Sequence, residues 1–294
     1  MDDKKFPFSK YHALGNDYIV IDPYYNKTAV NGEAVRLLCH RNYGIGGDGV
    51  LCGPIAFDGM FGVKIFNPDG SEAEKSGNGI RIFSKYLRDE RYVLPQAEFT
   101  LNTLGGVVSV RLLDYEADSI EVNMGKATFW SDEIPVAGPR RQVLHEKLDL
   151  DGRDLRVTCV SVGNPHCVVP MPDVISQALA CEIGPAIETH PNFPNRVNVQ
   201  FMKVIDKSTI EIEIWERGAG YTLASGTSSC AAASAAYALE LTGPSVTVKM
   251  PGGKLDVNIK EDGDIFITGS VNGVYSGDFH ENLIEGLKKI GVIE

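Results

Sequence analysis

Two segments of the chain place a serine and a glycine directly before a stretch with helical character. One covers residues 74–81 and the other residues 224–230, and their serines are Ser76 and Ser225. Serine is a favoured N-cap residue, so each segment predicts the start of a helix. The free N–H groups and the positive dipole end of a helix start favour an anion such as a carboxylate. Two such segments therefore predict that one small anion is held from two sides.

The stretches that follow these serines differ in composition. The first carries Ile80, Phe83 and Leu87 at helical spacing, which gives one apolar face. The second, residues 230–241, is rich in alanine on nearly every side. That composition is typical of a helix that is buried all round.

Bulk properties narrow the class of protein. The chain has 294 residues, 43% of them hydrophobic, and a net charge of −11. This composition is that of a globular protein with one large domain or two ordinary ones, and its charge argues against a nucleic-acid partner. No apolar run reaches membrane-spanning length, and residues 1–8 lack the apolar region of a signal peptide. We therefore expect a cytoplasmic protein with no membrane partner.

The cysteines show no pairing or metal-binding pattern. Six of them are scattered along the chain without a CxxC pair or the spacing of a metal site. We expect free and mostly buried thiols, and no metal centre.

Each half of the chain runs strands, helix, strands. A proline-containing break over residues 126–139 marks the expected boundary between the halves. Besides the two serine-led helices, short helices are expected over 31–40 and 280–290. Strands are expected over 18–22, 61–66, 99–101, 107–113, 119–123, 155–162, 167–169, 197–204, 209–215, 246–250, 255–259 and 265–268.

Glu216 lies at an unusual place in a strand pattern. Isoleucines alternate over residues 210–214, and Glu216 continues their apolar face. A carboxylate there is costly unless it is paired or binds something polar. The alternative is that the strand has already ended or bulged at Glu216, because Arg217 and Gly218 look like a strand end, and that Glu216 is a solvated rim residue.

Four asparagines lie beside glycine, proline or a strand end: Asn16, Asn67, Asn164 and Asn198. Each fits ordinary turn chemistry. An amide can also donate to a carboxylate and accept from an ammonium group, so these four asparagines could bind a zwitterion. His166 is either a loop histidine or one that handles a proton.

Taken together, these segments resemble the diaminopimelate epimerase family along nearly the whole chain. The segments that carry the resemblance occur in order and with suitable spacing: residues 14–17, 41–48, 66–72, 76–81, 163–166, 196–199, 215–218 and 224–227.

The resemblance implies an α/β (α+β) fold of two pseudo-symmetric lobes. Each lobe would be a barrel-like, mostly antiparallel sheet around a central helix, with the substrate in the cleft between them. The expected lobes are residues 1–126 plus 275–294, and residues 127–274. It also implies a homodimer that acts on a small-molecule amino acid with no pyridoxal phosphate, metal or nucleotide cofactor.

The resemblance further implies which residues form the site. In the family two cysteines exchange the α-proton of LL- and meso-diaminopimelate from opposite faces, a step in the supply of lysine and peptidoglycan precursors. The expected catalytic residues are Ser76, Ser225, His166 and Glu216. The expected substrate-binding residues are Asn16, Asn67, Gly77, Asn78, Asn164, Asn198, Glu216, Arg217, Gly226 and Thr227.

The chain departs from the family at both proton-transfer positions, where the cysteines are replaced by Ser76 and Ser225. A serine hydroxyl is far less acidic than a thiol and needs a neighbouring base to act at neutral pH. The pair is either an introduced replacement or a natural serine form. Further departures favour the natural form: Ile82 replaces a common cysteine, Gly49 a common glutamine and Ser228 a common glycine.

Three functions remain open at this point. The first is the diaminopimelate epimerase reaction itself. The second is a serine-type relative that acts on another amino or hydroxy acid. The third is a zwitterion-binding protein without turnover.

Overall fold

The computed structural model describes residues 5–150 and 152–293, which form two compact units. Unit 1 contains the residues up to Val122 and those from Gly269 onward, and unit 2 contains Asn123 to Thr268. Two strands cross the boundaries: β8 (Ser119–Lys126) and β17 (Asp264–Ser270). The described residues hold five helices and are mostly sheet.

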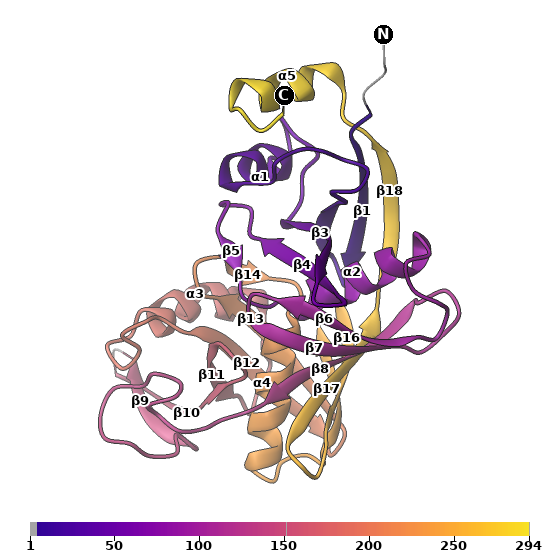
Figure 1. The fold of residues 1–294 in the computed structure, drawn as a ribbon. Helices are drawn as coiled ribbons and strands as arrows, with labels where there is room; N and C mark the ends of the chain where they lie inside the picture. The colour runs from indigo at the N-terminus through magenta and orange to yellow at the C-terminus, as the bar shows by residue number, and fades with distance from the viewer. Residues whose placement is uncertain (1–4, 151, 294) are drawn as a thin grey trace. The chain divides into compact units, whose positions relative to one another are not determined.

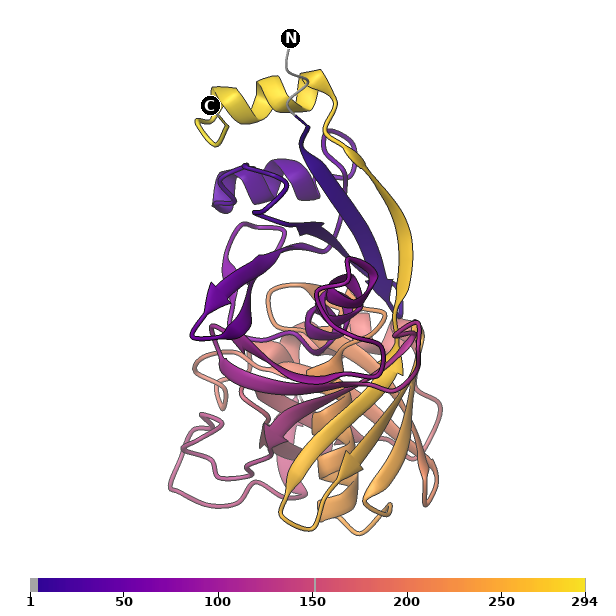
Figure 2. The same ribbon diagram turned by 45° about the vertical axis from the view of Figure 1, so that its right-hand side comes forward.

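Unit 1 is built around helix α2, which contacts strands β1, β2, β3 and β7. Strand β18 lies antiparallel beside β1, so the end of the chain returns to its beginning (Figures 1 and 2). Its elements are β1 (Pro7–Ala13), β2 (Asn16–Ile21), α1 (Gly32–Cys39), β3 (Gly49–Phe57), β4 (Met60–Phe66), β5 (Glu72–Ala73), α2 (Gly77–Asp89), β6 (Glu98–Thr103), β7 (Gly106–Leu112), β18 (Asn272–Asp278) and α5 (Glu281–Lys289).

Unit 2 is built in the same way around helix α4, which contacts strands β10 to β13, β15 and β16. Ten residues of α4 are buried, from Gly226 to Ala236, as the alanine-rich composition predicts. Its elements are β9 (Glu146–Leu150), β10 (Arg153–Ser161), β11 (Pro165–Pro170), α3 (Gln177–Glu188), β12 (Asn198–Asp206), β13 (Thr209–Glu216), β14 (Gly220–Thr222), α4 (Gly226–Ala238), β15 (Ser245–Met250) and β16 (Gly253–Ile259).

The strand pairings of the two units repeat one another. In unit 1, β2 lies parallel to β3 and β4 parallel to β6, whereas the other neighbours are antiparallel. In unit 2, β11 lies parallel to β12 and β13 parallel to β15. The parallel registers match Tyr18 with Gly49 and His166 with Asn198. These two pairs are therefore equivalent positions of the repeat.

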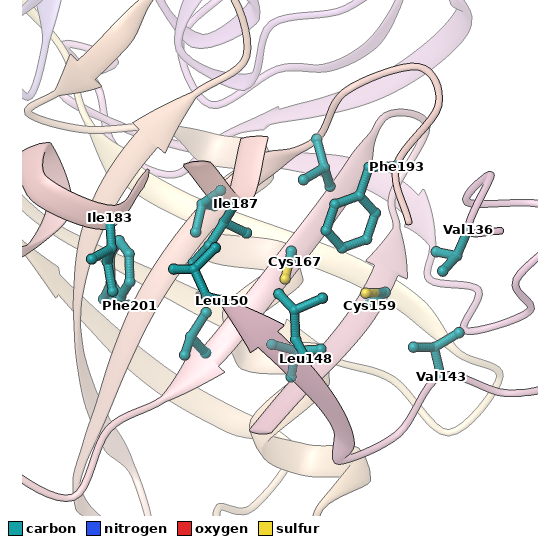
Figure 3. Packing of buried hydrophobic residues seen from close by; sticks show 14 of the residues in the cluster. Val136, Val143, Leu148, Leu150, Cys159, Cys167, Ile183, Ile187, Phe193 and Phe201 are labelled. Carbon is teal, nitrogen blue, oxygen red and sulfur yellow. The ribbon is translucent and has the colours of Figure 1, made fainter. Parts of the chain in front are cut away.

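Each unit has its own apolar core outside its central helix. In unit 1 the core joins α1 and α5 and includes Leu38 and Leu287. In unit 2 it fills the space between α3, β9 and the sheet (Figure 3). Figure 3 shows Cys159 and Cys167 within this core, to which Leu148 also belongs. Five of the six cysteines are buried, and only Cys181 is exposed.

The structure corrects parts of the sequence-based element map. A strand was expected over 18–22, but β2 begins at Asn16, and the turn before it is only Leu14 and Gly15. Strand β3 was assigned no element, and neither was helix α3, which has Pro185 in its last turn. Strands β1, β5, β9, β14 and β18 were also missed. None of the helices in residues 5–150 and 152–293 has the length and apolar character needed to span a membrane.

Candidate active site

Ser76 caps helix α2, as the sequence predicts. Its backbone is extended (φ −140°, ψ 116°), and its Oγ accepts a hydrogen bond from the Gly79 backbone N–H at 3.1 Å. The hydroxyl of Tyr18, on β2, lies 3.3 Å from the same Oγ. Gly77 is the first residue of the helix and is buried. The first turn of α2 contains no acidic residue, so its dipole is open to an anion.

A chain of amides leads from α2 into strand β2. Asn78 donates from Nδ2 to Oδ1 of Asn16 at 3.0 Å, and Asn16 donates from Nδ2 to Oδ2 of Asp48 at 3.1 Å. Arg81, which is fully buried in α2, donates from Nη2 to Oδ1 of Asn78 at 2.8 Å. These bonds fix the orientation of both predicted binding amides.

Asp48 belongs to a cluster of charged side chains at the end of this series of hydrogen-bonded amides. Arg41 contacts Asp17 at 2.9 Å and Asp48 at 2.7 Å, and Lys10 contacts Asp17 at 2.7 Å. Burial acts to raise the pKa of Asp17, but hydrogen bonds from Arg41 and Lys10 outweigh it and lower the pKa to about 2. Burial raises the pKa of Asp48. Two cations thus stabilise the carboxylate of Asp17, and one of them, Arg41, also pairs with the Asp48 carboxylate that bonds Asn16.

Asn67 follows strand β4 in a turn. Its Nδ2 donates to the Ser71 hydroxyl at 3.0 Å, and its backbone N–H donates to the Ser71 carbonyl at 2.9 Å. The hydroxyl of Ser71 also donates to Asp69 at 2.6 Å. The amide of Asn67 therefore has the turn partner that its sequence context predicts, and its role toward a substrate stays a prediction.

In unit 2, Ser225 caps helix α4 in the same conformation (φ −147°, ψ 129°). Its Oγ accepts from the Ser228 backbone N–H at 3.4 Å and lies 3.4 Å from the hydroxyl of Thr227. Ser225 is 6% exposed, and Gly226 is the first residue of the helix. Both predicted hydroxyl positions are therefore helix caps.

His166 lies on β11 and is completely buried. Its Nε2 is 2.9 Å from Oδ1 of Asn164, its Nδ1 has no hydrogen-bond partner among the described residues, and Gln200 lies on the adjacent strand β12. Gln200 donates from Nε2 to the Ser228 hydroxyl at 3.0 Å. Burial lowers the pKa of His166 to about 3, so the imidazole is neutral at physiological pH.

The segment after β13 is held by Asn198 and by a buried carboxylate. Asn198 donates from Nδ2 to the Pro165 carbonyl and accepts from the Arg217 backbone N–H, both at 2.9 Å. Glu188, at the end of α3, accepts from the Gly218 backbone N–H at 2.9 Å and from the Trp215 indole at 2.7 Å. The same carboxylate also pairs with Arg196.

Glu216 is the last residue of β13 rather than a rim residue beyond it. It pairs with Gly220 of β14 and is half-buried. Arg217, which follows it, donates from Nη1 to the Asn195 carbonyl at 3.1 Å. The structure therefore brings Glu216, Arg217 and Asn198 together at one end of the β12–β13 pair.

Sequence reasoning missed several residues that hold the predicted ones in place. They are Tyr18, Asp48, Arg81, Glu188 and Gln200. Asp48 and Arg81 lie inside segments that carry the family resemblance, so the sequence could have indicated them as site residues. Tyr18 and Gln200 look like ordinary strand residues in the sequence. Glu188 belongs to a helix that the sequence analysis did not predict.

The chain matches the family model described as diaminopimelate epimerase over residues 8–130 and 158–274. It is 52% identical to "Diaminopimelate epimerase 2" of Nostoc sp. (strain PCC 7120) over 272 residues, which cover 92% of this chain and 94% of that protein. It is 41% identical to the diaminopimelate epimerase of Methanothermobacter thermautotrophicus over 262 residues, 87% of this chain and 91% of that protein.

Solved structures confirm the two-part fold. A hydroxyproline epimerase from Agrobacterium vitis aligns with a TM-score of 0.68 at 15% identity, over 94% of this chain and 91% of that one. A methylitaconate-delta-isomerase aligns with a TM-score of 0.64 at 13% identity, over 95% and 96% of the two chains. The fold and the family together make this chain an isomerase of the epimerase and racemase class. Within that class it belongs to the diaminopimelate epimerase family.

Proposed function

We propose that this chain interconverts LL-diaminopimelate and meso-diaminopimelate, the reaction that its relatives' names imply. The family model and the 52% identity to a named diaminopimelate epimerase support this assignment. The observation that carries it is the pair of glycine-led helix starts, capped by Ser76 and Ser225. In this proposal both serines serve one α-carbon, and one hydroxyl delivers a proton while the other position accepts one.

The surrounding residues have defined parts in the proposal. The N–H groups at the starts of α2 and α4 bind carboxylate groups of the substrate. Asn16 and Asn78, held by Asp48 and Arg81, present fixed amides to a zwitterion. In unit 2 the corresponding part belongs to Asn164, Asn198, Glu216, Arg217 and Thr227. The reaction uses no cofactor, and the enzyme acts as a cytoplasmic homodimer.

The serines limit the rate in this proposal. The groups within hydrogen-bonding distance of Ser76 and Ser225 include a phenol, a hydroxyl and backbone amides. These groups are poor bases at neutral pH. His166 is neutral and bonded to Asn164, on a strand that α4 contacts. We therefore expect slow proton exchange by the native chain.

The test is α-proton exchange of LL-diaminopimelate in deuterated water, followed by NMR. The native chain is compared with the Ser76→Cys/Ser225→Cys double variant, whose thiols are far more acidic. We expect exchange by the native chain and a rate about 10²- to 10⁴-fold higher in the double variant.

Other outcomes separate the remaining functions. Exchange by the double variant alone identifies an epimerase scaffold whose proton-transfer pair is disabled. Absence of exchange in both forms contradicts the substrate assignment. A panel of amino and hydroxy acids then tests the serine-type relative, and tight calorimetric binding without exchange identifies the zwitterion-binding protein.

A further inference from the structure

Tyr18 is a residue of strand β2 to which the preceding account gives no part in the reaction. It is 6% exposed, and its hydroxyl lies 3.3 Å from Oγ of Ser76. The backbone N–H of Gly79 donates to the same Oγ at 3.1 Å. A serine oxygen has two lone pairs. When Tyr18 donates, both lone pairs are engaged, and the remaining hydrogen-bonding group of Ser76 is its own O–H.

The position of the Tyr18 ring depends on Gly49 across the parallel β2–β3 pair. A Cβ atom at position 49 would lie 2.5 Å from Cε1 and 2.9 Å from Cδ1 of Tyr18. It would also lie 2.4 Å from the Phe66 carbonyl oxygen. The missing side chain at position 49 provides the space in which the tyrosine ring lies.

The repeat gives Tyr18 a counterpart in unit 2. The register Tyr18–Gly49 in β2–β3 is equivalent to His166–Asn198 in β11–β12. His166 is one of the expected catalytic residues. Tyr18 thus occupies, in unit 1, the place that a predicted catalytic residue occupies in unit 2.

We propose that Tyr18 is a positioning residue for Ser76, whose hydroxyl donates a hydrogen bond to Oγ and stabilises its deprotonated form. This inference rests on the proposed function, because it assumes that Ser76 gives a proton to an α-carbon. In that step the Ser76 O–H bond breaks and a C–H bond forms with the electron pair of the carbanion. The negative charge moves to Oγ, where the hydrogen bonds from Tyr18 and Gly79 hold it.

The first experiment compares deuterium exchange in native protein, Tyr18→Phe and Tyr86→Phe. Tyr86 is the matched control, because it is another buried tyrosine of unit 1 whose hydroxyl donates to Asp22 rather than to the serine. We expect Tyr18→Phe to lower the exchange rate by about 10- to 100-fold, as for loss of a hydrogen bond to a charged group, and Tyr86→Phe to change it less than about twofold. Equal rates for native protein and Tyr18→Phe overturn the inference and leave the proposed function intact.

The second experiment does not depend on turnover. A thiol is introduced by Ser76→Cys in a Cys181→Ser background, which removes the exposed native cysteine. Its alkylation by iodoacetamide is followed against pH, with and without Tyr18→Phe. If Tyr18 stabilises the deprotonated group, Tyr18→Phe raises the thiol pKa and slows alkylation at pH 7 by about tenfold. An unchanged pH profile overturns the inference. If native protein exchanges no substrate, the proposed function fails and this profile alone decides the part of Tyr18.

Discussion

The two helix starts share one backbone design but have different polar surroundings. Around α2 the surroundings are charged: Arg81 is buried in the helix, and Asp48 links its amides to Arg41. Around α4 the buried polar neighbours are uncharged: Gln200 donates to Ser228 of the helix, and the imidazole of His166 is neutral.

This difference shows that the repeat fixes geometry but not chemistry. The strand registers and the capping conformations agree between the units, so both serines have the same backbone setting. Only the side chains that face them differ. A two-base reaction needs one proton donor and one acceptor at any moment, and unequal surroundings favour different protonation states at the two positions.

The turns that carry binding residues also differ between the units. In unit 1 the turn after β4 is supported by Arg36 of α1, which donates to the Asp69 carbonyl in an exposed position. In unit 2 the segment after β13 is supported by Glu188 of α3, a carboxylate that is 4% exposed. We therefore expect unit 2 to depend more strongly on its supporting side chain.

The largest predicted effect is that of Glu188→Ala. The substitution leaves the Trp215 indole and the Gly218 N–H without their acceptor, and we expect the free energy of unfolding to fall by about 3–5 kcal/mol. Urea unfolding followed by tryptophan fluorescence measures this. The matched control, Arg36→Ala, removes an exposed support and is expected to cost about 1 kcal/mol or less. Equal losses of unfolding free energy in the two variants would contradict the prediction that unit 2 depends more strongly on its supporting side chain.

Much of the fold could be predicted from the sequence because local patterns agree with tertiary structure. Both serine caps, the alanine-rich helix and the β10–β13 strands follow from composition and periodicity. Helix α3 was missed because its segment contains Gly184 and Pro185, which weaken a helix prediction. In the structure Gly184 lies against Trp215, where a Cβ atom would be 2.7 Å from Cγ of the indole. A tertiary contact therefore explains a residue that looks unfavourable in the sequence.

The candidate site could be predicted only in part, and for a related reason. Asn16 and Asn78 stand out in the sequence, but the hydrogen bond between them spans 62 residues and no local pattern shows it. Tyr18 looks like an apolar strand residue until the β2–β3 register places it beside Gly49. Contacts that depend on register and on a missing side chain require the three-dimensional structure.

The second prediction concerns the loss of stability in acid, which is expected in different pH ranges for His166 of unit 2 and Asp17 of unit 1. His166 has a folded pKa of about 3, below the usual value near 6.5, so protons bind preferentially to the unfolded state. Stability is therefore lost as pH falls from about 6.5 toward 3, by up to about 1.4 kcal/mol per pH unit. Asp17 has a folded pKa of about 2, so its contribution is present above about pH 4 and is lost only below it.

Variants of each residue test these two pH windows. His166→Gln should flatten the loss of unfolding free energy between pH 6.5 and about 4, and Asp17→Asn should flatten it below about pH 4. The pKa of Asp48 is raised by burial, so its effect on the pH dependence of stability has the opposite sign to that of Asp17. The contribution of Asp17 is therefore taken as the difference between the Asp17→Asn and native curves of unfolding free energy against pH. A native curve that His166→Gln leaves unchanged above pH 4 would show that the imidazole is not held neutral by the fold.

The smallest predicted effect compares two buried serines of α4. The Ser228 hydroxyl accepts a hydrogen bond from Gln200 at 3.0 Å, whereas the Ser234 hydroxyl has no hydrogen-bond partner among the described residues. Ser228→Ala leaves a buried amide N–H unpaired and should lower the unfolding free energy by about 1–2 kcal/mol. Ser234→Ala removes an unpaired hydroxyl and replaces it with the best helix former, so stability should be unchanged or should rise by up to about 1 kcal/mol. Thermal unfolding of both variants measures the difference. Similar losses in both would show that Gln200 draws no stability from Ser228, and that the neutral surroundings of α4 are packed rather than hydrogen-bonded.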